Sequence, residues 1–141
     1  MCMKQFGVWQ RYSWQDETLT PDSNPLADIG GELLHLRGQF EVGDAGQLTF
    51  AIRGLPVVYD AAKQELSCQG KTAPLEPVHG TIQLEILADR TSLEIFGNRG
   101  RIYMPIGAIA ADSNRSLQLS VRGGTAKIRA LEVYRLRLAW Q

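Results

Sequence analysis

The sequence lacks the features that mark several common classes of protein. Its 141 residues include only two cysteines, Cys2 and Cys68, which form no CxxC pair and are too few for a disulfide framework, so both are expected to be free thiols. No apolar run approaches the roughly 18–20 residues of a membrane-spanning helix. Fifteen Lys and Arg residues balance fifteen Asp and Glu residues. A general nucleic-acid binder, which usually has a basic excess, is therefore not expected.

Sequence motifs for metal binding and for catalysis are missing as well. The two histidines, His35 and His79, lie in different segments, and no HxxxH, HExxH or CxxC spacing accompanies them. There is no GxSxG elbow and no GxxxxGKS loop. We therefore expect no metal and no cofactor. We interpret His35, which alternates with leucines, as a structural residue at the surface or at the boundary of the core.

The N-terminal segment has no continuous apolar stretch of the kind found in a secretory signal. We expect the chain either to be cytoplasmic or to be a piece of something longer. Residues 11–28 are polar and rich in turn formers, so residues 1–28 are predicted to be a strap or linker, with Trp9 and Trp14 as candidate anchors. The remaining residues, 29–141, are predicted to form one module.

Short segments in which apolar and polar residues alternate dominate this module. They lie at 32–41, 47–53, 55–59, 81–88, 92–97, 101–105, 116–121 and 126–138. Such segments at this spacing indicate an all-β sandwich of two antiparallel sheets, and no segment has a clean helical stripe longer than two turns. The imperfect spacing in the last segment predicts a β-bulge.

Three of these segments are predicted to form a meander. Asp89-Arg90 and residues 98–100 have turn composition, so the segments 81–88, 92–97 and 101–105 would be joined by two hairpins. Period-two alternation places one set of side chains in the core, and these are Ile82, Leu84, Ile86, Leu93, Ile95, Ile102 and Met104. The same alternation places four others on the outer side of the sheet, namely Glu94, Phe96, Arg101 and Tyr103.

Residues 84–100 read LEILADRTSLEIFGNRG. This segment resembles the signature of the C-terminal β-sandwich module of glycoside hydrolase family 32, the levanases, inulinases and invertases, in which D-R-[ST]-S-[ILV]-E-[IV]-F is followed by N-x-G. The matching residues are Asp89, Arg90, Thr91, Ser92, Leu93, Glu94, Ile95, Phe96, Asn98 and Gly100. Weaker matches at 57–60 and 131–140 extend the resemblance over about 32–140. It implies a concanavalin-like jelly roll.

The resemblance also implies what the chain does not do. The motifs of the family's catalytic propeller, W-M-N-D-P-N-G, R-D-P and E-C, do not occur in this sequence. We therefore expect no glycosidase activity. Within the family the sandwich is known as a structural companion of the propeller and, in some relatives, as a carbohydrate-binding module that recognises terminal fructose of levan or related fructans. The resemblance implies a secreted or periplasmic origin.

A furanose presents vicinal hydroxyl groups, which carboxylates and guanidinium groups bind by charge-assisted hydrogen bonds. The residues predicted to bind the sugar are Asp89, Arg90, Glu94, Arg101 and Tyr103. All of these except Arg101 have an alternative role. Asp89 would cap its own turn, Arg90 and Glu94 would pair across the hairpin, and Phe96 with Tyr103 would form a small second core under the N-terminal strap.

The leading hypothesis is therefore a non-catalytic module that binds β-fructan, of the levan or inulin type, at its termini. Affinity is expected to be micromolar to millimolar, as for shallow polar sites. The alternative is a structural module that packs on a glycosidase catalytic domain or self-associates without binding sugar. A small hydrolase of another kind would need two carboxylates about 5–9.5 Å apart in a cleft, and nothing in the sequence asks for it.

Overall fold

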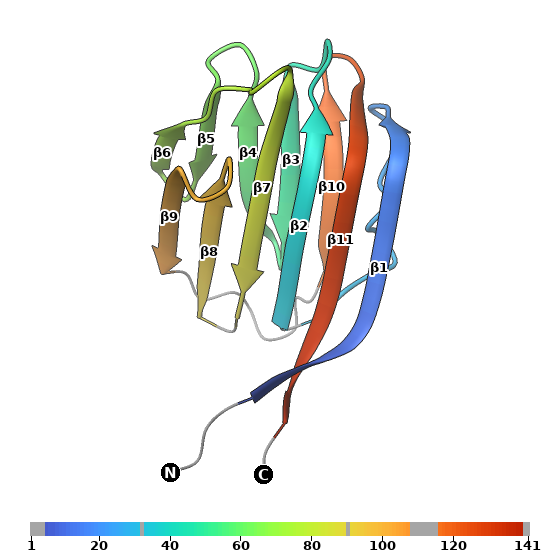
Figure 1. The fold of residues 1–141 in the computed structure, drawn as a ribbon, viewed down its shortest axis with the longest axis vertical. Helices are drawn as coiled ribbons and strands as arrows, with labels where there is room; N and C mark the ends of the chain where they lie inside the picture. The colour runs from blue at the N-terminus through green and yellow to red at the C-terminus, as the bar shows by residue number, and fades with distance from the viewer. Residues whose placement is uncertain (1–4, 32, 90, 108–115, 140–141) are drawn as a thin grey trace.

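The computed structural model describes residues 5–31, 33–89, 91–107 and 116–139, and all regular structure in these ranges is β (Figure 1). The strands are β1 (Gln5–Leu19), β2 (Leu33–Glu41), β3 (Gln47–Ile52), β4 (Leu55–Asp60), β5 (Glu65–Cys68), β6 (Lys71–Pro74), β7 (Thr81–Ala88), β8 (Ser92–Gly97), β9 (Ile102–Gly107), β10 (Leu117–Arg122) and β11 (Ala126–Ala139). The described part of the chain includes no helix long and apolar enough to cross a membrane.

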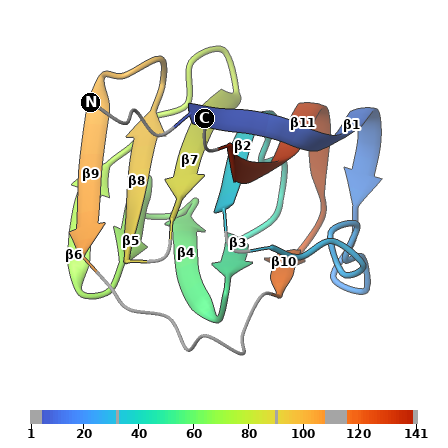
Figure 2. The ribbon, with the colours of Figure 1, turned by 90° about the horizontal axis from the view of Figure 1, so that it is seen from below.

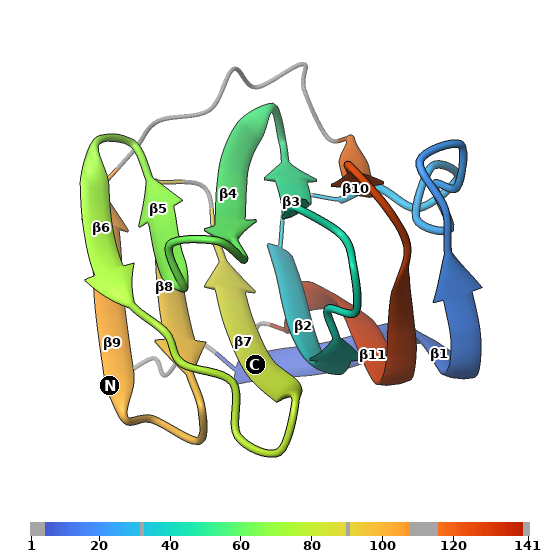
Figure 3. The same cartoon turned by 90° about the horizontal axis from the view of Figure 1, so that it is seen from above.

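The strands form two antiparallel sheets that pack face to face. The first sheet has six strands in the order β1-β11-β2-β7-β8-β9, and the second has five in the order β10-β3-β4-β5-β6. Figures 2 and 3 look along the molecule from its two ends, and both show the two sheets as separate layers. The predicted all-β, two-sheet antiparallel β-sandwich is thus confirmed.

The N-terminal segment differs from the prediction of a strap or linker over residues 1–28. Gln5–Leu19 is a strand at the edge of the six-stranded sheet, paired along its length with β11. Tyr12 and Trp14 pack against the core from this strand, and Leu19 is buried in it. Charged and polar residues between these side chains hide the alternation in the sequence. Charged and polar residues are tolerated in an edge strand because one of its faces is exposed to solvent.

The loop that follows β1 closes one side of the sandwich. Leu26 and Ile29 are buried, and the Asn24 side-chain oxygen accepts a hydrogen bond from the backbone N–H of Leu119 on β10 (3.1 Å). Figures 2 and 3 both show this loop beside β10. On the other side, the edge strands β6 and β9 are joined by the Lys71 ammonium group, which donates to the Pro105 carbonyl (2.9 Å).

The predicted meander is confirmed as β7, β8 and β9. Of its predicted inner residues, all except Ile102 are buried, and Ile102 packs against the core as a partly buried residue. Burying each such side chain contributes about 1.5–3 kcal/mol, which holds the register of the three strands. The predicted bulge is also present, as a register shift between Ile128 and Ala130 where β11 pairs with β2.

The turn between β8 and β9 explains the N-x-G part of the motif. Asn98, Arg99 and Gly100 all have positive φ, at 47°, 60° and 82°. Asparagine and glycine enter this region at the lowest steric cost. The Asn98 side chain also accepts from the backbone N–H of Gln83 (3.1 Å) and donates to the carbonyl of Glu76 (2.7 Å). The motif residues here build the hairpin that frames one end of the six-stranded sheet.

A buried hydroxyl group on β4 gives a first test of the fold. Tyr59 is 1% exposed, and its hydroxyl donates to the Leu75 carbonyl (2.9 Å). Burial raises the pKa of Tyr59, so the hydroxyl stays a donor. Tyr59→Phe leaves that carbonyl without its donor and is expected to lower the free energy of unfolding by about 1–2 kcal/mol, measured by urea denaturation. Tyr103→Phe, at an exposed hydroxyl, is the control, and an equal loss in both variants would contradict the assignment.

Candidate functional site

Asp89, the first of the predicted sugar-binding residues, lies in the turn between β7 and β8. Its Oδ1 atom accepts from the backbone N–H groups of Thr91 and Ser92, both at 2.8 Å, and from the Ser92 hydroxyl at 3.1 Å. Desolvation raises the pKa of Asp89, but these hydrogen bonds outweigh it, so the pKa lies below its ordinary value. The geometry matches the alternative role of a turn cap. Arg90 lies outside the described residues.

Glu94 and Tyr103 lie together on the outer face of the six-stranded sheet. The Tyr103 hydroxyl donates to Glu94 Oε1 (3.2 Å), and the Tyr103 ring stacks on Phe96 with centroids 4.9 Å apart. No strap covers this pair, because β1 is at the opposite edge of the sheet and Tyr103 is 52% exposed. Phe96 and Tyr103 stack on each other, but among the described residues no N-terminal strap covers them to form the second small core considered as an alternative.

The predicted residues do not converge on one place. Asp89 precedes β8 and Arg101 follows its far end, so the length of that strand, roughly 17 Å at the usual rise per residue, separates them. Asp89 and Glu94 share a hollow of about 320 Å³ whose other walls are largely leucine. Arg101 lines a different hollow at the other end of the sheet. One furanose ring cannot contact both groups.

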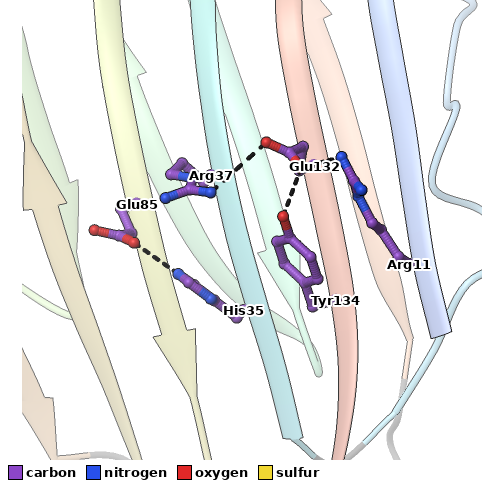
Figure 4. Close-up of polar contacts among 6 residues, drawn as sticks. All are labelled: Arg11, His35, Arg37, Glu85, Glu132 and Tyr134. Atoms are coloured by element: carbon purple, nitrogen blue, oxygen red, sulfur yellow. Dashed lines mark hydrogen bonds and ion pairs between the residues drawn. The ribbon is translucent and has the colours of Figure 1, made fainter. Parts of the chain in front are cut away.

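A polar network that the sequence did not reveal crosses the outer face of the same sheet (Figure 4). Its centre is Glu132 on β11, which accepts from the Tyr134 hydroxyl and pairs with Arg11 (2.7 Å) and Arg37 (3.7 Å). The Tyr134 hydrogen bond, with the two guanidinium charges, holds the pKa of Glu132 below its usual range. Glu132 is therefore a carboxylate at neutral pH, and it orients Arg37 from the neighbouring strand.

A second pair continues the network toward β7. His35 Nε2 lies 2.7 Å from Glu85 Oε2, and the His35 ring packs against the Tyr134 ring with centroids 5.6 Å apart. The register shows why these groups meet, since Glu132, Arg37 and Glu85 are directly opposite one another on β11, β2 and β7. His35, which was interpreted as a structural residue at the surface or at the boundary of the core, contacts both Glu85 and Tyr134.

Beside this row the sheet surface is hollowed. The hollow measures about 470 Å³, and its walls include Arg37, Gln39, Gln83, Glu85, Phe96 and Arg99. A second hollow of about 430 Å³ adjoins it and shares three of these residues, Gln39, Gln83 and Arg99. The first hollow therefore offers a guanidinium fork, a carboxylate, two amides and an aromatic ring, which are the groups that bind hydroxylated ligands.

Only some of the residues at this site could be predicted from the sequence. The outward alternation of His35, Arg37 and Gln39 is visible in it, but such residues are ordinary on a solvated strand face. The partner Glu132 is almost a hundred residues away, and only the strand order brings it beside Arg37. Among the described residues, no group of three or more His, Cys, Asp or Glu side chains is placed to hold a metal ion.

Comparisons with known proteins agree with one another. A family model described as "Glycosyl hydrolases family 32 C terminal" matches residues 8–135. A levanase from Bacillus subtilis (strain 168) is 30% identical over 151 aligned residues, which cover 90% of this chain and 22% of the levanase. A levanase from Bacillus sp. (strain L7) is 35% identical over 69 residues, 49% of this chain and 8% of that protein. The chain thus spans about a fifth or less of these relatives.

Solved structures show the same fold. The exo-inulinase from Aspergillus awamori superposes with a TM-score of 0.74 at 20% identity, over 92% of this chain and 29% of that one. The galectin LEC-6 from Caenorhabditis elegans superposes with a TM-score of 0.63 at 13% identity, over 86% of this chain and 94% of that one. The sandwich is therefore one part of the inulinase and nearly the whole of the galectin chain.

Proposed function

The chain belongs to the glycosyl hydrolase family 32 C-terminal family, and from this premise we propose that it binds β-fructan of the levan or inulin type. The residues that match, 8–135, are those of the family's C-terminal sandwich and not those of its catalytic propeller. Its relatives include proteins named levanase and exo-inulinase. A sandwich that holds the polymer would keep such an enzyme on its substrate.

The observation that carries the proposal is the hollow beside Arg37 and Glu85. Its volume of about 470 Å³ lies in the range of small-molecule sites. Arg37 donates in a planar fork and Glu85 accepts, which suits two neighbouring hydroxyl groups of one furanose ring. Phe96 supplies an apolar surface for the ring carbons. We assign the terminal fructosyl unit to this hollow.

A second role is compatible with the first because it uses the opposite face of the molecule. On the five-stranded sheet, one row across all five strands consists of small, uncharged side chains in register, namely Ser120, Thr49, Val58, Ser67 and Thr72. Depletion of charged residues is typical of the centre of protein interfaces, although serine is depleted there as well. This face suits packing against a glycosidase catalytic domain, the alternative function considered from the sequence.

Calorimetric titration with levan, inulin and dextran tests the proposed binding. We expect saturable binding to one or both fructans and none to dextran. Glu85→Gln keeps the shape of the side chain but removes its charge, and it is expected to weaken fructan binding about three- to tenfold, because charge-assisted hydrogen bonds are stronger than neutral ones. The matched control is Glu65→Gln on β5 of the other sheet, which is expected to bind like the unmodified protein.

Two outcomes would contradict the proposal. The first is the absence of any binding heat with levan and with inulin at a millimolar concentration of fructosyl units. Packing on a catalytic domain would then remain as the proposed function. The second is an equal effect of Glu85→Gln and Glu65→Gln, which would place any binding away from the outer face of the six-stranded sheet.

A further inference from the structure

We infer that the outer face of the six-stranded sheet holds two adjoining saccharide subsites, so that the protein binds a fructan terminus together with the unit linked to it. This inference rests on the proposed fructan binding and adds a second site to it. The second subsite is the hollow of about 430 Å³ that adjoins the first, and its distinguishing residue is Arg101.

The two hollows adjoin each other along β7, and together they are called the groove. Gln39, Gln83 and Arg99 line both of them. The groove follows β7, since Glu85 borders the first hollow and Thr81 the second. Four residues of a strand span about 13 Å, which is longer than one sugar ring. Gln83 lies midway and faces both hollows, so its amide is placed to contact the linkage between two units.

Hydrogen bonds hold the shared wall in place. Arg99 Nε donates to Gln83 Oε1 (3.2 Å), and the Asn98 side chain fixes the backbone of Gln83. No residue that the structure describes accepts from the terminal N–H groups of Arg99, because its bond to Gln83 uses Nε. A residue that is fixed through one atom and open at the others can orient a ligand at low entropic cost.

The chemistry of the second hollow differs from that of the first. Its walls include Arg99, Arg101, Arg129 and His79, and Arg129 is already paired with Glu41 (2.9 Å). Arg101 forms no ion pair with any residue that the structure describes. The hollow thus offers donors, whereas Glu85 gives the first hollow an acceptor. Donors suit ring, linkage and hydroxyl oxygens of a second unit.

The direction of the groove supports a polymer as the ligand. The second hollow lies where β7 begins, at Thr81, and where the β8–β9 turn closes that end of the sheet. Figure 1 shows the first residues of β1 and the last residues of β11 at the opposite end of the molecule. A fructan whose terminal unit occupies the first hollow would therefore leave the protein past His79, away from the start of β1 and the end of β11.

Titration with ligands of increasing length tests the inference. The probes are methyl β-D-fructofuranoside, which holds the furanose ring, and the β-2,6-linked difructoside and trifructoside. We expect affinity to rise about five- to tenfold from the monosaccharide to the disaccharide, as one or two charge-assisted hydrogen bonds are added, and little from there to the trisaccharide. Arg101→Ala is expected to bring the disaccharide affinity down to that of the monosaccharide.

The controls separate this inference from the proposed function. Arg122→Ala removes a guanidinium group from β10 of the other sheet and is expected to keep the full gain. Equal affinities for mono- and disaccharide, or an equal fall for both in Arg101→Ala, would overturn the second subsite while fructan binding stands. Binding of no probe would overturn the proposed function and the inference together. Saturable binding of inorganic phosphate with no gain from monosaccharide to disaccharide would assign the second hollow to anions instead.

Discussion

Phe40→Ala is expected to lower the free energy of unfolding by about 3–5 kcal/mol. Phe40 lies on β2, at the centre of the six-stranded sheet, and is fully buried between the two layers. Its ring meets the Phe50 ring of the opposite sheet edge-on, with centroids 5.6 Å apart. Truncation removes the transfer free energy of the ring and leaves a cavity that a two-sheet core fills poorly. In a chain of this size the melting temperature should fall by roughly 10 °C.

The surroundings of Phe40 show why the loss cannot be relieved easily. Gly38 is two residues earlier on the same strand, and a Cβ atom there would lie 2.6 Å from the Phe40 ring. The glycine leaves a space that the Phe40 ring fills, with the Leu131 side chain beside it. Phe40→Leu retains most of the apolar volume and is expected to cost less than about 1.5 kcal/mol. A melting temperature for Phe40→Ala within 2 °C of the unmodified protein would contradict the central role of this contact.

The alternation of apolar and polar residues predicted the strands that have one face in the core and the other in solvent. In β7 every second residue is buried, and the alternation of apolar and polar residues in the sequence shows this directly. In β1, Tyr12 and Trp14 pack against the core, but polar residues surround them in the sequence, which therefore suggested a linker. The short strands β5 and β6 have four residues each, too few for a pattern to stand out from a loop.

The candidate site was harder to predict because it depends on strand order. The motif at 84–100 pointed to the hairpins, and two of its residues, Asp89 and Asn98, are used to cap and close turns. These two motif residues therefore stabilise the turns on either side of β8. The hollow on the outer face joins side chains of β2, β7 and β8 with the turn after β8, which are separate in sequence. No local pattern encodes that juxtaposition.

The largest expected effect on binding is that of Arg37→Ala. Its guanidinium group lies on the wall of the first hollow beside Glu85, and Glu132 holds it from the other side. Removing a group that donates two charge-assisted hydrogen bonds is expected to weaken fructan binding about 30-fold or more. Arg37 is an exposed surface residue, so the melting temperature should change little. Titration of both proteins with levan and with inulin measures the difference.

Comparison with the hairpin residues then decides between the two locations on the sheet. Asp89→Asn keeps an acceptor for the turn, and Glu94→Gln keeps the shape of the side chain in the leucine-rich hollow that both residues line. If the sugar occupies the hollow beside Arg37, both variants should bind fructan within about twofold of the unmodified protein. The walls of their hollow are mostly leucine side chains, which cannot form hydrogen bonds with sugar hydroxyl groups. Removing water from hydroxyl groups that find no new partner costs free energy. A loss of binding in these variants with normal affinity in Arg37→Ala would move the site to the β7–β8 turn, where the sequence motif first placed it.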